Sequence, residues 1–414
     1  MNDIFVNIYT TAYFLSFVAL FIIYNKRQMN KINATSYTLL YCSITALFSL
    51  LYYNVSNGIY RDYSNLTLYP YLYLFVSYII ILYPLYYNDQ QIHMRISIDS
   101  HKIKFIRILI YIIIACSILP LIESLIQIPN SITDSSSMSS MYEQRLEGSG
   151  NDYLSFFGRK FFLVLWRLNN FIPFLLFYVI IKGYNKKIIV CIVLSLLTIW
   201  LHSIILGGRS KLVQNALYVI FVYFVFYPQI QKEIRIKMAK YGVVLISVVV
   251  AGIAAVSISR FSSKEGATSM NSIWEWLGLY AGEGSLNFNA LAWDAKGTTS
   301  GYCTFCLPKG LIEGELISVE ELWSMKSKLG IPGNIFYTFM GPFVFDYGLG
   351  GGIFVLIILT VIFMKVYKRC NAFKKLCLIG LWGKIAIIGP IFYTYGTIDD
   401  QINLFITCLI IYIL

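Results

Sequence analysis

Charged residues are scarce in this chain, and their scarcity excludes an ordinary soluble domain. Of the 414 residues, 13% are charged and 57% are hydrophobic, whereas soluble domains carry about 25% charged residues. Apolar runs of about 20 residues recur, and each is long enough to cross a ~30 Å hydrocarbon core as a helix. Helices are required because they pair their backbone polar groups within one segment. The sequence therefore predicts an all-α polytopic membrane protein.

Histidine is also rare, which argues against a zinc site. The chain has 3 histidines, and the long polar segment 260–334 has none. That segment contains one Cys-x-x-Cys motif, Cys303 and Cys306, but not the second pair of ligands that a structural zinc site needs. We predict two ordinary thiols, with a local disulfide as the alternative. We expect no metal and no other cofactor.

Basic residues lie in short segments that alternate with polar segments of a different composition. The excess of 33 Lys and Arg over 21 Asp and Glu would suit nucleic acid, but the alternation is typical of the positive-inside rule. We therefore expect no nucleic-acid partner and an N-terminus outside the cytoplasm. Because the N-terminal sequence lacks a basic region and a small-residue cleavage site, we also expect no cleaved signal peptide. About 11 transmembrane helices are predicted, at 4–24, 36–54, 69–87, 105–126, 161–181, 188–206, 212–227, 241–259, 349–366, 376–395 and from 402 onward.

Two outer segments are long enough to contribute to a binding site. Segment 127–158 begins rich in serine, and its second half is charged. Segment 260–334 is the only long polar stretch, and its aromatic residues argue against disorder. We expect residues 1–414 to form a single integral membrane domain in which 260–334 folds as a cap over the site. Trp274, Trp276 and Tyr280 either stack on sugar rings or form the core of the segment itself.

The sequence Gly-Gly-Arg-Ser-Lys, residues 207–211, follows the sixth predicted span. A helix that begins there presents free backbone N–H groups. Arg209 offers a planar fork for phosphate oxygens, and Lys211 adds a point charge. The stretch predicts a diphosphate site at the membrane surface, or else an interfacial turn against lipid headgroups. Its spacing is not that of a P-loop. Other outer cations that can reach the same diphosphate are Arg145, Arg159 and Arg260.

Few residues near the outer surface can act as a general base. His202 precedes the glycine pair by about one turn, and it is either a base or a packing residue. Asp346 precedes a glycine run, and it caps a helix, pairs with an arginine or acts as a base. Glu143 is a third candidate. The sequence does not rank Glu123, Glu283 and Asp294 against it.

Three features together carry a resemblance to a known family. They are the span that ends in residues 206–211, one large external loop late in the chain from Arg260, and Gly341-Pro342 followed by Phe-Asp-Tyr-Gly-Leu-Gly at 345–350. This layout resembles the Wzy-type O-antigen or capsule repeat-unit polymerases of Gram-negative bacteria. The resemblance implies a GT-C-like helical fold in the bacterial inner membrane, with a large periplasmic loop and a periplasmic active site. It matches Arg209 and Arg260 to diphosphate-binding arginines, although neither is followed by the Arg-x10-Gly spacing of some members.

The implied activity is that of a glycosyltransferase in lipopolysaccharide or other polysaccharide biosynthesis. It moves a growing glycan from undecaprenyl diphosphate to the next undecaprenyl-diphosphate-linked oligosaccharide, while the lipid tails stay in the membrane. Cations neutralise the leaving diphosphate in place of a metal, and attack opposite the leaving group inverts the anomeric centre. A chain-length regulator is a further possible partner. The alternatives are an O-antigen ligase, which needs nearly the same arginines, and a polysaccharide flippase or transporter.

Overall fold

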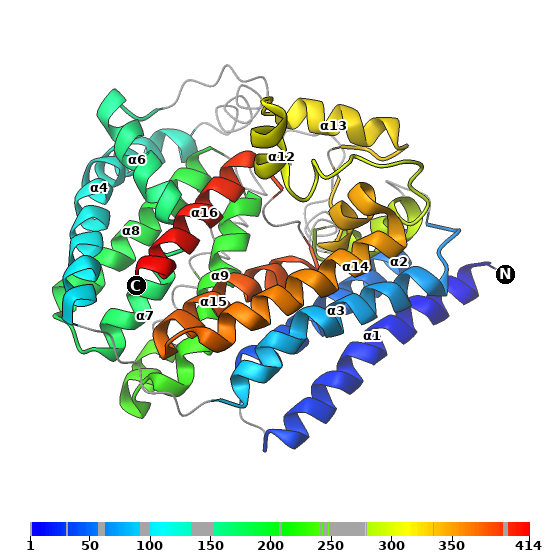
Figure 1. Cartoon of the computed structure of the whole chain (residues 1–414), viewed down its shortest axis with the longest axis horizontal. Helices are drawn as coiled ribbons and strands as arrows, with labels where there is room; N and C mark the ends of the chain where they lie inside the picture. Colours follow the sequence, from blue (N-terminus) through cyan, green and yellow to red (C-terminus); the bar gives the residue numbers. More distant parts are fainter. Residues whose placement is uncertain are drawn as a thin grey trace. The chain divides into compact units, whose positions relative to one another are not determined.

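The computed structural model describes residues 2–29, 32–56, 63–91, 100–133, 153–206, 209–240, 280–333, 335–391 and 396–414, with the single positions 242, 247 and 278. Every regular element within these ranges is helical (Figure 1). The chain divides into two compact units. Unit 1 comprises residues 1–94 and 272–404, and unit 2 comprises residues 95–271 and 405–414.

Seven of the described helices are long and apolar enough to cross a membrane, and a bent pair makes an eighth candidate. This confirms the helical membrane protein predicted from the sequence. The total of about 11 spans stays a prediction, because only positions 242 and 247 of the span 241–259 are described. Two other predicted spans form short helices, α15 (Ala372–Ile388) and α16 (Ile398–Ile413). The seven helices are α1 (Asn2–Arg27), α2 (Ala34–Ser56), α3 (Leu68–Asp89), α4 (Ser100–Thr133), α8 (Lys186–Ile205), α9 (Arg209–Phe226) and α14 (Met340–Arg369).

Unit 1 is a helical bundle in which α3 packs against α1, α2, α14 and α15. The Tyr73 hydroxyl donates to the Leu349 carbonyl at 2.7 Å, and the Tyr367 hydroxyl donates to Asn88 Oδ1 at 2.9 Å. One bond joins the early residues of α3 and α14, and the other joins their late residues. The two helices therefore run parallel and side by side (Figure 1).

One end of unit 1 gathers basic residues from segments far apart in the sequence. The Tyr24 hydroxyl of α1 donates to Asp89 Oδ2 at the end of α3, at 3.0 Å. The Lys375 ammonium group lies 5.4 Å from the ring centroid of Tyr367, so α15 begins at this end as well. The positive-inside rule associates such an end with the cytoplasm. Its basic residues are Lys26, Arg27, Lys365, Lys368, Arg369, Lys374 and Lys375.

The described part of the long polar segment, 280–333, is folded at the opposite end of unit 1. It contains a π-helical turn η2 (Phe288–Ala292), α12 (Cys306–Glu313) and α13 (Val319–Lys328). The Asn289 amide pairs with both backbone groups of Thr67, just before α3, at 3.1 and 2.7 Å. The Ser49 hydroxyl of α2 donates to the Gly282 carbonyl at 2.8 Å. These bonds fix the segment to the ends of α2 and α3.

In unit 2, α8 packs against α4, α6, α7 and α9. The span predicted at 161–181 is broken into α6 (Phe156–Leu168) and α7 (Ile172–Ile181), which are bent by 71° relative to one another. Helix α9 supplies partners for the break: Asn169 donates to Asn215 Oδ1, and Tyr218 donates to the Asn170 carbonyl, both at 3.1 Å. Backbone freed by a break at membrane depth needs such partners.

Candidate functional site

The site residues predicted from the sequence fall in both units. Unit 2 contains His202, Lys211, Arg159 and Arg209, of which Arg209 is the first residue of α9. Unit 1 contains Asp346 and Tyr280. The other predicted site residues lie outside the described part of the chain; these are Glu143, Arg145, Arg260, Trp274 and Trp276.

His202 lies in the last turn of α8 and is connected to α4 by hydrogen bonds. The Tyr153 hydroxyl lies 2.8 Å from His202 Nδ1 and 2.8 Å from Ser124 Oγ of α4. In the tautomer in which Nδ1–H donates to Tyr153, the Tyr153 O–H donates to Ser124 and Nε2 carries the lone pair. Tyr153 thereby orients the imidazole ring as a general base requires.

Aromatic side chains of α6 connect His202 to the cation on α9. The Phe162 ring centroid lies 3.9 Å from that of His202, and the Trp166 ring stacks on Phe162 at 6.3 Å. The ammonium group of Lys211, which is half-buried, lies 5.8 Å from the Trp166 ring centroid. His202 and Lys211 therefore belong to one contiguous group of side chains. We call this group, with Ser124, Tyr153, Phe162 and Trp166, the histidine cluster.

Glu123 holds the beginning of α6 against α4. The Ser155 hydroxyl donates to Glu123 Oε1 at 2.5 Å, and the hydroxyl oxygen of Ser155 accepts from the Gly158 N–H at 3.1 Å. A Cβ atom at Gly158 would overlap the Glu123 carboxylate, so glycine permits the close approach. A carboxylate at a helix N-terminus is also favoured by the helix dipole. This contact fixes the turn that carries Arg159, whose side chain is exposed.

Asp346 is buried in unit 1 and accepts three hydrogen bonds. The Thr299 hydroxyl and the Cys303 N–H reach Oδ1 at 2.5 and 3.1 Å, and the Thr304 N–H reaches Oδ2 at 2.6 Å. The carboxylate therefore secures the turn that precedes α12. Of the three roles predicted from the sequence, this geometry favours a capping role over that of a base, which needs an accessible lone pair.

The two cysteines near Asp346 are free thiols, as predicted, and the alternative disulfide is not formed. Both are buried. Burial raises the pKa of the Cys303 thiol to about 12 and that of Cys306 to about 11. Because the thiolate is the reactive species, neither buried thiol is suited to act as a nucleophile.

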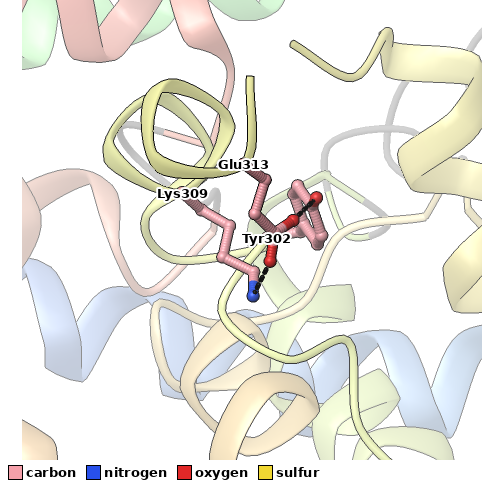
Figure 2. Close-up of polar contacts among 3 residues, drawn as sticks. All are labelled: Tyr302, Lys309 and Glu313. Carbon is pink, nitrogen blue, oxygen red and sulfur yellow. Dashed lines mark hydrogen bonds and ion pairs between the residues drawn. The ribbon is translucent and has the colours of Figure 1, made fainter. Parts of the chain in front are cut away.

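A polar clasp joins this turn to the end of α12 (Figure 2). Lys309 Nζ lies 2.5 Å from Glu313 Oε1, and the Tyr302 hydroxyl donates to Glu313 Oε2. Lys309, and then Tyr302, hold the pKa of the Glu313 carboxyl below its usual value. The bond to Glu313 raises the pKa of Tyr302 to about 12.

Tyr280, predicted to stack on sugars, lies with its ring centroid 5.8 Å from that of Phe336.

Four members of the histidine cluster were not predicted from the sequence: Ser124, Tyr153, Phe162 and Trp166. Phe162 and Trp166 are four residues apart, so they share one face of a helix, and this spacing was an available signal. Tyr153 gave no such signal, because it lies outside any predicted span and meets His202 only in the tertiary structure.

Comparison with known proteins gives no family for this chain: no protein-family model, curated protein or solved structure matches it. Within the described residues, no group of three or more His, Cys, Asp or Glu side chains is placed to hold a metal ion. The function must therefore be argued from the geometry of the histidine cluster and from the sequence.

Proposed function

We propose that the protein polymerises lipid-linked oligosaccharide repeat units by transferring glycan from undecaprenyl diphosphate to the next lipid-linked repeat. The observation that carries the proposal is the contiguity of His202 and Lys211 in the histidine cluster of a polytopic membrane protein. Such a cluster combines a candidate base and a cation where apolar helices end. A lipid-borne substrate can reach this position without leaving the bilayer.

The leaving diphosphate is the group that needs positive charge. As the bond between the anomeric carbon and the diphosphate oxygen breaks, negative charge develops on that oxygen, and fixed cations lower the energy of this state. Lys211 is assigned this role, with Arg159 on the first turn of α6 and Arg209 at the first residue of α9. The free N–H groups at the start of α9 add to the same field.

The acceptor hydroxyl needs a group to take its proton. Its oxygen forms the new bond to the anomeric carbon, and we assign the released proton to His202 Nε2. The proton goes to Nε2 because Tyr153 holds Nδ1. Ser124 in turn holds Tyr153, so these two residues position the base and do not contact the substrate. Attack from the face opposite the diphosphate inverts the anomeric centre.

The test is the length of the surface glycan in cells that lack the gene and are complemented with variants. We expect Lys211→Gln and His202→Gln each to lower elongation about a hundredfold or more, leaving single-repeat products. Tyr153→Phe, which removes two hydrogen bonds, is expected to cost about tenfold. Lys186→Gln, an exposed lysine at the other end of α8, is the matched control for loss of charge. Full-length glycan from both Lys211→Gln and His202→Gln, at normal protein levels, would refute the proposal.

The same experiment separates the alternative functions. A polymerase deletion leaves single repeats attached to lipid A core, whereas a ligase deletion leaves finished polymer on its lipid carrier. A flippase deletion leaves lipid-linked repeats on the cytoplasmic face. Purified protein that extends lipid-linked repeats in the presence of EDTA would further support metal-independent transfer.

A further inference from the structure

Unit 1 has a groove along the outside of two membrane-crossing helices, at the end where basic residues gather. The groove has a volume of about 570 Å3 and lies between α3 and α14. Ile80, Ile357 and Val361 are among its apolar lining residues, and Lys365 and Lys368 line it as well. The groove therefore combines an apolar lining with two ammonium groups, as a phospholipid combines apolar chains with a charged headgroup.

The orientation of the two helices places both lysines at one end of this groove. Because α3 and α14 run parallel, the late residues of α14 lie beside the late residues of α3, as the bond from Tyr367 to Asn88 shows. Lys368 also lies 5.4 Å from the ring centroid of Tyr87, which fixes its position near the end of α3. The apolar part of the groove therefore extends from the lysines toward the middle of the helices.

A second groove of about 270 Å3 lies on the other side of the same ridge of α3. Ile79 and Tyr83 line both grooves. The smaller groove is lined by residues of α1 and α2 as well, and Arg27 is its basic residue. Two apolar grooves that share a ridge, each with basic residues toward the same end of the bundle, match the two acyl chains and the single anionic headgroup of a glycerophospholipid.

The polar groups of the lining do not favour a sugar as the occupant. The Thr360 hydroxyl already donates to the Leu356 carbonyl at 2.8 Å. Within the described residues, neither Lys365 nor Lys368 has a carboxylate partner. Two ammonium groups beside an apolar groove attract an anion, and the bilayer supplies one at the level of its phosphates. Basic pockets between helices on the cytoplasmic side are a known form of anionic lipid site.

We propose that this site binds an anionic glycerophospholipid of the cytoplasmic leaflet. Its phosphate contacts Lys365 and Lys368, and one acyl chain lies along Ile80, Ile357 and Val361. The second chain crosses the ridge at Tyr83 into the smaller groove. This lipid site is independent of the glycosyl transfer proposed for unit 2, and it stabilises unit 1 because a ligand that binds only the folded state opposes unfolding.

The test uses the purified full-length protein in detergent, titrated with phosphatidylglycerol or with phosphatidylcholine of the same acyl chains. Native mass spectrometry counts the bound lipids, and the shift in Tm reports stabilisation. We expect tighter binding of phosphatidylglycerol and a higher Tm in its presence. The double variant Lys365→Gln with Lys368→Gln is expected to bind phosphatidylglycerol about 25-fold more weakly, at about fivefold per lysine.

Two further variants keep the proposal falsifiable. The double variant Lys237→Gln with Arg369→Gln removes two exposed charges that do not line the groove, and its lipid affinity should equal that of the original chain. Val361→Trp fills the groove and keeps both lysines, and it should weaken binding of either lipid. Equal binding of the two lipids by the original chain, or equal losses in both double variants, would overturn the proposal.

Discussion

Replacing Asp346 tests whether this carboxylate secures the turn before α12. Its side chain is 3% exposed and accepts from Thr299, Cys303 and Thr304. Each buried donor left without an acceptor costs about 1–3 kcal/mol. Asp346→Ala leaves three such donors, and we expect a loss of about 4 kcal/mol. Asp346→Asn keeps one acceptor oxygen, and we expect about 2 kcal/mol.

The reactivity of Cys303 reports this loss directly. Its side chain is 1% exposed, and burial raises its thiol pKa to about 12, so a maleimide reacts with it only when the turn opens. Local opening follows its own free energy, and each 1.4 kcal/mol changes the open population tenfold. The labelling rate, measured by mass spectrometry, should rise about 30-fold in Asp346→Asn and about 700-fold in Asp346→Ala.

The matched control is Asp294→Asn, which changes an exposed carboxylate in the same polar segment. Its Cys303 labelling rate should equal that of the original chain. Unchanged labelling in Asp346→Ala would refute the capping role. A variant with slow labelling but no glycan elongation would instead assign Asp346 to the chemistry.

Two further predictions concern packing and pH. Gly282→Ala places a Cβ 2.6 Å from backbone atoms of Phe48 and Ser49, which no side-chain rotation relieves, so thermal unfolding should show a loss of about 1–3 kcal/mol. Gly350→Ala, with nothing within 4 Å of its Cβ, is the control and should not destabilise. Because the folded-state pKa of Glu313 is depressed, its stabilisation is present above its unfolded pKa and is lost as pH falls through the folded value. The hydrogen-exchange protection factors in α12, each referred to the intrinsic exchange rate at the same pH, should therefore fall in acid, and Glu313→Gln should remove that pH dependence; protection that still falls in acid in Glu313→Gln would contradict this reasoning.

The membrane spans illustrate what local sequence can predict. Hydropathy follows from side-chain chemistry summed over about 20 residues, and the helices predicted near 4–24, 36–54 and 69–87 match α1, α2 and α3. The span predicted to start at Leu349 belongs to α14, which begins earlier, at Met340. Gly348 adopts φ +69°, a conformation that glycine tolerates, and α14 is kinked there.

The broken span in unit 2 shows where hydropathy is insufficient. Residues 161–181 are apolar enough to be read as one helix, but Asn169 and Asn170 are stabilised by Asn215 and Tyr218 of α9. A break is tolerated only where another helix satisfies the exposed polar groups. That condition depends on a contact between segments about 46 residues apart, which no local window contains.

By itself, the sequence determined that the chain is a helical membrane protein, which residues carry charge, and that His202 and Lys211 belong to the ends of successive helices. Those properties follow from composition and from the alternation of apolar and basic segments. Only the tertiary structure decided that Tyr153 and Ser124 orient His202, that Phe162 and Trp166 join it to Lys211, and that Asp346 is enclosed by three donors. Hydrogen bonds and ring contacts act over a few ångströms, so their partners are set by how distant helices pack and not by spacing along the chain.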